Sequence, residues 1–129
     1  VDYAGSVIAL AVEIGLLPPP VGLSELIEAT DGDEELKTEM INAFCEDLEE
    51  SFRKIDQSMK DGDLQGVSAE GHALKGSAPY FGADKFADLA EELHRVSKDG
   101  DAKSVQPVLE ACRTEYRRIL GFFEAMHGS

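Results

Sequence analysis

The sequence predicts an all-α protein, an antiparallel up-down four-helix bundle with an additional helix at the N-terminus. Its composition favours helix, because Ala, Leu, Glu and Lys together far outnumber the β-branched residues. Apolar residues recur at steps of three and four in each long stretch, which is the period of an amphipathic helix. Short corners separate these stretches, and helices joined by short corners lie antiparallel to their neighbours.

Size and charge narrow the classes of function. The chain has 129 residues, enough for one domain with a substantial core. Its formal net charge of -14 argues against binding nucleic acid or an anionic membrane through bulk electrostatics. Cys45 and Cys112 fall within helical stretches, so we expect buried thiols rather than a disulfide scaffold. A reducing, cytoplasmic location fits this pattern.

Residues 1–20 are predicted to form an amphipathic helix that ends at a run of three prolines. Its apolar side consists of Tyr3, Val7, Leu10, Ile14 and Leu17. The segment carries Asp2 and Glu13 and is too short to span a bilayer. It is expected either to pack on the bundle formed by residues 21–129 or to bind a partner, including a second copy of the chain in a homodimer. The chain starts at Val1 rather than Met, so the sequence leaves open whether it is a fragment of a longer protein.

Four longer helices are predicted after a short helical piece at 22–29. The first two are expected at 33–60 and 63–81, and the other two are centred on 86–96 and 105–126. Each has an apolar side spaced by three and four: Leu36, Met40, Phe44, Leu48, Phe52, Ile55 and Met59 in the first, Leu64, Val67, Gly71, Leu74, Ala78 and Phe81 in the second, Phe86, Leu89, Leu93 and Val96 in the third, and Val105, Val108, Cys112, Tyr116, Ile119, Phe123 and Met126 in the fourth.

The triplet Asp-Gly-Asp occurs at three of the predicted corners, at 31–33, 61–63 and 99–101. Glycine suits the left-handed position after a helix, and aspartate caps the start of the next one. The remaining corner uses Gly82 and Asp84. None of the triplets is followed by the oxygen ligands of a calcium loop, so we interpret them as helix corners.

One histidine on the second long helix, His72, is a candidate functional residue. On a helical projection it lies away from the apolar side, so it is expected to point to solvent. Lys75 and Gly76 lie beside it at i+3 and i+4. Gly71 and Gly76 each cost the helix about 1 kcal/mol relative to alanine, so a compensating role is expected. A helix crossing explains Gly71, whereas close approach of a partner to the imidazole better explains Gly76.

The run from His72 to Ala78 (HALKGSA), followed by Phe81-Gly82-Ala83, resembles the signature of the histidine-containing phosphotransfer (HPt) domains of two-component phosphorelays. That signature has the form H-x-L-K-G-[SGA]-[SA], then a large apolar residue and Gly-Ala. The helix pattern from about residue 33 to 126 also fits the four-helix bundle of that family. Pro79 departs from the pattern and is expected to kink or loosen the last turn of its helix.

The resemblance implies a signal-transduction phosphoprotein in which His72 accepts a phosphoryl group from the aspartyl-phosphate of a receiver domain, or passes it to one. Lys75 would offset the charge of the phosphoryl group, and Gly76 would leave room for the partner's active site. The implied partners are a response-regulator receiver domain, a hybrid histidine kinase, or both.

The chain has no metal cluster, Walker loop or ATP-binding pattern of its own. We therefore expect no cofactor in this chain, Mg2+ in the partner receiver domain, and a phosphocarrier rather than an autonomous enzyme. Two alternatives stay open: the phosphoacceptor domain of a larger hybrid or chemotaxis-type histidine kinase, and a non-catalytic helical adapter.

Receiver contacts are expected from one small face of the helix, together with exposed positions of the adjoining long helix. The face consists of Gln65, Ser68, Ala69, Ala73, Lys75 and Gly76. Glu91 and His94 have the Glu-x-x-His spacing of di-iron bundles, but residue 69, three before His72, is alanine, so the second pair is missing. We therefore predict no metal site and expect His94 to be solvated.

Overall fold

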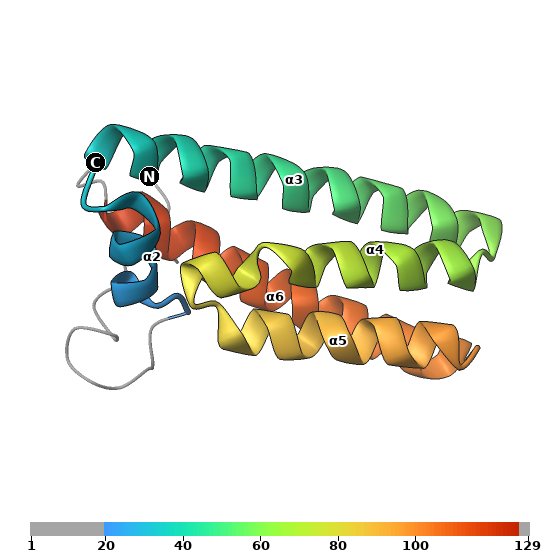
Figure 1. Ribbon diagram of the computed structural model, residues 1–129. Coiled ribbons are helices and arrows are strands. Elements are labelled where there is room, and N and C mark those ends of the chain that lie inside the picture. Colours follow the sequence, from blue (N-terminus) through green and yellow to red (C-terminus); the bar gives the residue numbers. More distant parts are fainter. Residues whose placement is uncertain (1–19, 127–129) are drawn as a thin grey trace.

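The computed structural model describes residues 20–126. Four helices lie side by side as a bundle, and a shorter helix lies at one end of it (Figure 1). The shorter helix is α2 (Leu23–Thr30), and the bundle consists of α3 (Glu34–Asp61), α4 (Leu64–Gly76), α5 (Asp84–Lys98) and α6 (Ala102–Met126). A 3-10 helix, η1 (Ala78–Phe81), connects α4 to α5. The predicted all-α bundle is confirmed, whereas the predicted helix within residues 1–20 lies outside the described residues.

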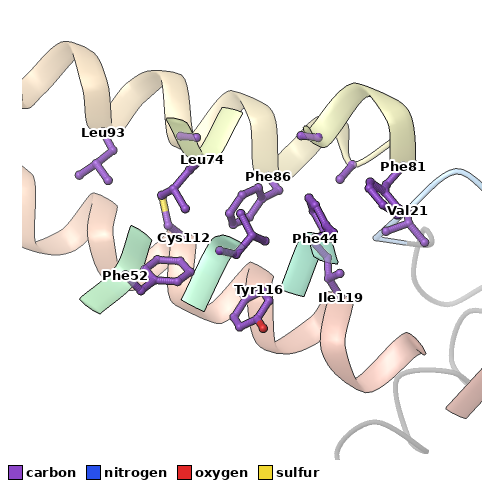
Figure 2. Close-up of a cluster of buried hydrophobic side chains, with 14 of the residues drawn as sticks. Val21, Phe44, Phe52, Leu74, Phe81, Phe86, Leu93, Cys112, Tyr116 and Ile119 are labelled. Atoms are coloured by element: carbon purple, nitrogen blue, oxygen red, sulfur yellow. The ribbon is translucent and has the colours of Figure 1, made fainter. Parts of the chain in front are cut away.

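The core lies between the four long helices, and Figure 2 shows side chains from all of them pointing into it. Phe44 of α3 stacks on Phe81 of η1 with ring centroids 4.2 Å apart. The predicted apolar sides of α4 and α5 are buried almost throughout. On α3, Leu36 was wrongly placed in the core. Its side chain is 39% exposed, because the helix begins at Glu34, beyond the edge of the packed region.

The Asp-Gly-Asp corners have the predicted geometry. Gly32, Gly62 and Gly100 all have positive φ, between 70° and 76°. Asp33 accepts hydrogen bonds from the amides of Glu35 and Leu36, and the equivalent aspartates Asp63 and Asp101 accept from Gly66 and Ser104. These caps satisfy amide groups that a helix start leaves without an intrahelical partner.

The end of α4 differs from the prediction. The helix was expected to continue to residue 81, but it stops at Gly76 and the chain continues as η1. Pro79 is the physical reason, because it lacks an amide hydrogen and cannot bond to the carbonyl four residues earlier. The expected loosening of the last turn is therefore a change from α to 3-10 geometry.

The corner after η1 holds α2 against the bundle. The amide of Gly22 donates to the carbonyl of Phe81 at 2.7 Å. Gly82 has a φ of 59°, and a Cβ there would lie 2.7 Å from the backbone of Gly22. Ala83, not the expected Asp84, takes the N-cap position of α5, so Asp84 lies in its first turn.

Both cysteines are free thiols, with Cys112 buried and Cys45 half-buried. Burial raises the pKa of each thiol, in the case of Cys112 to about 12. Among the described residues, no helix is both long and apolar enough to cross a membrane.

Candidate functional site

His72 lies on the exposed side of α4 (yellow-green in Figure 1). The opposite side of the same helix is anchored in the core by Val67 and Leu74, neither of which is measurably exposed. A side chain held on a packed helix has a fixed backbone position. The bundle therefore fixes the backbone of the helix at His72, while the imidazole ring is exposed to solvent.

The two glycines beside His72 have different roles. A Cβ on Gly71 would lie 3.0 Å from the backbone nitrogen and 3.2 Å from the Cα of His94, so Gly71 allows α4 and α5 to cross closely. A Cβ on Gly76 would meet no atom of residues 20–126 within 4 Å, apart from its own helix backbone and its chain neighbours. Packing within the described residues thus accounts for Gly71 but not for Gly76.

Lys75 makes an ion pair that joins α4 to α5. Its Nζ lies 2.9 Å from Oε2 of Glu91, and the two side chains are 45% and 51% exposed. The hydrogen bond and positive charge of Lys75 are the main causes that hold the pKa of Glu91 below its ordinary value. The ammonium group expected to meet a phosphoryl group is therefore already bound to a carboxylate.

His94 was expected to be solvated, and this is wrong. Its ring is partly buried, and its Nδ1 lies 2.9 Å from the carbonyl oxygen and 3.0 Å from Oγ of Ser68. A carbonyl oxygen only accepts, so Nδ1 of His94 is the protonated nitrogen in this arrangement. The ring centroid of His94 lies 5.7 Å from that of His72, so two imidazoles are neighbours at the site.

Five of the six residues expected to contact a receiver are exposed: Gln65, Ala69, Ala73, Lys75 and Gly76. The expectation for Ser68 needs correction, because only 5% of the residue is exposed and its hydroxyl faces His94. The crossing at Gly71 brings α5 over the polar side of α4 and covers Ser68. Ser68 joins two helices rather than belonging to the exposed face.

Glu91 and His94 are the neighbours of His72 that sequence reasoning missed. Both lie on α5, whereas additional contacts were expected from the adjoining long helix. Their spacing of three residues places both side chains on one side of a helix. From the sequence, this spacing was interpreted only as a possible metal-binding pattern, not as a pair facing α4. In the structure Glu91 binds Lys75 and His94 binds Ser68. No group of His, Cys, Asp and Glu among residues 20–126 has a geometry that would hold a metal ion.

A cleft of about 790 Å³ lies between α3 and α6, away from His72. Phe52 and Tyr116 form part of its wall, and Arg113 and Asp56, which form an ion pair, also line it. Neither His72 nor Lys75 lines it. The imidazole is instead on an exposed helix face, outside this cleft.

Comparisons with known proteins agree with this geometry. The sequence model of the Hpt domain matches residues 39–122, which is more than half of the chain. Over 80 residues the chain is 30% identical to the phosphorelay intermediate protein YPD1 of Candida albicans, a match that covers 59% of this chain and 44% of that protein. The chain thus matches less than half the length of this curated relative.

A crystal structure shows the same fold. It is that of the histidine-containing phosphotransfer protein B (HptB) from Pseudomonas aeruginosa PAO1, with a TM-score of 0.75 and 23% sequence identity. The superposition covers 88% of this chain and all of that one. The chain belongs to the Hpt domain family, the class of helical bundles that carry phosphoryl groups on histidine.

Proposed function

We propose that this protein is a phosphorelay carrier in which His72 accepts a phosphoryl group from the aspartyl-phosphate of a receiver domain, or passes it to one. The observation that supports this most directly is the exposure of His72 on a helix that is packed on its other side. An imidazole that is neutral near pH 7 is a competent nucleophile.

In the proposed transfer, the carboxylate of the partner's aspartate is the leaving group. The lone pair of an unprotonated ring nitrogen of His72 attacks phosphorus, and the bond between phosphorus and the aspartyl oxygen breaks. The electron pair of that bond leaves with the carboxylate, and the proton on the other ring nitrogen stays on the ring. Because the reaction depends on positioning and charge stabilisation, one well-presented nucleophile suffices on this side of the complex.

Lys75 and Gly76 are proposed to assist in different ways. Lys75, one helical turn from His72, offsets negative charge on the phosphoryl group. Gly76 leaves space beside the ring, which is supported by the open surroundings of a Cβ placed there, with no other packed atom of the described part of the chain within 4 Å. Gln65, Ala69 and Ala73 complete the docking face. It is small, which suits a transient encounter.

Mutation of the acceptor tests the proposal. Incubation with a phosphorylated receiver domain should give acid-labile, alkali-stable label on the wild-type chain and none on His72→Gln. The chain contains three histidines, and His127→Gln, which changes a histidine outside the described residues, is the matched control and should still be labelled. Circular dichroism should show an unchanged helical fold for His72→Gln. Label that persists in His72→Gln would refute the assignment.

We further propose that Mg2+ acts in the receiver and not in this chain. The acidic residues of α3 give this protein a strongly negative side, which repels a receiver whose carboxylates are not neutralised by metal. Chelation of Mg2+ should therefore weaken docking, as measured by isothermal titration of receiver into the chain. Docking with equal affinity in both conditions would contradict this.

The two alternative functions give different results in these assays. A non-catalytic adapter would bind its partner equally well as wild type and as His72→Gln, without any label. A phosphoacceptor domain of a larger kinase would be labelled on His72 by the catalytic part of that kinase, supplied as a separate protein with ATP.

A further inference from the structure

The ion pair of Lys75 has a consequence for phosphotransfer. Nζ of Lys75 lies 2.9 Å from Oε2 of Glu91, so its positive charge is shared with a carboxylate before any phosphoryl group arrives. Both side chains are about half exposed. Exposed ion pairs are weak, so the ammonium group exchanges readily between a carboxylate and a stronger anion nearby.

Glu91 and His72 are close enough to influence each other electrostatically. After the two effects of Lys75, and against a desolvation effect that raises it, the pKa of Glu91 is also lowered by the rings of His94 and His72 when these carry positive charge. Such an interaction is mutual and changes sign with the charge. A carboxylate that is stabilised by positive charge on the His72 ring is therefore destabilised by a phosphoryl group on it.

We infer that Glu91 is a positioning residue for phosphotransfer: it holds Lys75 against α5 while His72 is free and competes with the phosphoryl group for Lys75 once His72 is modified. This inference rests on the proposed role of His72 as phosphoacceptor. Competition of this kind limits how strongly the phosphoryl group is held. A carrier that must release the group again benefits from such a limit.

Phosphoramidate is a suitable probe, because it phosphorylates histidine without a protein partner and so separates the chemistry from docking. The lone pair of the imidazole nitrogen forms a bond to phosphorus, and the original phosphorus–nitrogen bond breaks. The nitrogen of phosphoramidate, which already carries three protons in the zwitterionic form present near neutral pH, departs with the electron pair of the broken bond as ammonia. The loading rate is followed by 31P NMR of the 129-residue chain.

Glu92→Gln provides a matched control for Glu91→Gln. Glu92 is the next residue on α5 and carries the same charge, but its carboxylate binds Arg95, with the Arg95 Nε 3.1 Å away. Releasing Lys75 should make Glu91→Gln load about threefold faster than wild type, the size expected for an exposed ion pair. Glu92→Gln should load at the wild-type rate, and both variants should unfold close to the wild-type denaturant concentration, because exposed ion pairs add little stability.

A second pair of proteins tests whether Glu91 acts through Lys75. In a Lys75→Gln background, the further change Glu91→Gln should alter the loading rate by less than half as much as it does in wild type. Equal rates for Glu91→Gln and Glu92→Gln would overturn the inference. An equal effect of Glu91→Gln with and without Lys75 would overturn it too, since it would show only general charge repulsion.

Failure of the inference is distinguishable from failure of the proposed function. If His72→Gln is not labelled and Glu91→Gln behaves like Glu92→Gln, His72 remains the acceptor and only the role of Glu91 is lost. If His72→Gln is still loaded by phosphoramidate and by a phosphorylated receiver, the acceptor assignment itself fails.

Discussion

At residue 76 the backbone of α4 faces open space, whereas at residue 71 it touches α5. Both residues are glycines in the same helix and lie within five positions of the same histidine. Alanine has the better helix propensity at either position. The glycine at residue 71 is therefore required by the packing of the fold, whereas the glycine at residue 76 is expected to be required by the partner.

Gly76→Ala should leave the free energy of unfolding unchanged or raise it by up to about 1 kcal/mol, because nothing in the described residues obstructs the added methyl group. Labelling of His72 by a phosphorylated receiver should slow on the order of tenfold or more, because the methyl group displaces the approaching active site. Denaturant unfolding and the labelling rate measure the two effects.

Gly71→Ala is the matched contrast for this prediction. Its Cβ would press on the backbone of His94, which cannot rotate away, so stability should fall by about 1–3 kcal/mol. A Gly76→Ala protein that is labelled at the wild-type rate would show that the space at Gly76 is not used by the partner.

At the scale of elements, the site is shared between α4 and α5. α4 supplies His72, Lys75 and Gly76, and α5 supplies Glu91 and His94. Ser68 and His94 fasten the two helices together, and Lys75 and Glu91 do so nearer the end of α4. The surroundings of His72 thus depend on how two helices cross, not on one helix alone.

The turn that follows α4 also helps to hold this helix in place. Pro79 ends α-helical geometry after Gly76, and η1 then inserts Phe81 into the core beside Phe44. The amide of Gly22 binds the carbonyl of Phe81, which ties the start of α2 to the same corner. The segment after the histidine is therefore held at both the core and the end of the bundle.

At the scale of the whole molecule, the tightly packed core affects how stability depends on pH. Burial raises the pKa of Cys112 from its ordinary value of 9.0 to about 12. Tyr116, four residues further along α6, also has a raised pKa, chiefly because of burial and then because of Cys45 and Glu49. Both groups are neutral in the folded protein at pH values where they ionise in the unfolded chain.

This predicts loss of stability in alkali. A raised pKa in the folded state gives stability that is complete below pH 9 and is lost as the pH rises from 9 towards 12 for Cys112. The free energy of unfolding should fall by about 1.4 kcal/mol per pH unit for each group that ionises only on unfolding. Urea unfolding at pH 8 to 11 measures the slope.

Cys112→Val supplies the control, because it removes the thiol and keeps an apolar side chain of similar size in the core. Its unfolding free energy should fall less steeply above pH 9 than that of the wild type. Identical slopes for the two proteins would exclude a contribution from Cys112.

Association of two chains is another property of the whole molecule. The homodimer expected through residues 1–20 remains a prediction.

Much of the fold follows from the sequence alone, because its signals are local. The spacing of apolar residues depends only on the helical period, and it correctly placed the buried sides of α4, α5 and α6. The Asp-Gly-Asp corners depend on backbone preferences within three residues, and they too have the predicted form. The exposure of His72 follows from the same helical period.

Tertiary structure alone decided what surrounds His72. Lys75 and Glu91 are 16 residues apart, and Ser68 and His94 are 26 apart, so each pair forms only where two helices meet. A helical projection placed Ser68 on the polar side of α4, but the close approach at Gly71 brings α5 over it. The sequence by itself thus determined the bundle and the exposed histidine. The crossing of α4 and α5 determined its neighbours, because the distance between helices depends on the packing of both.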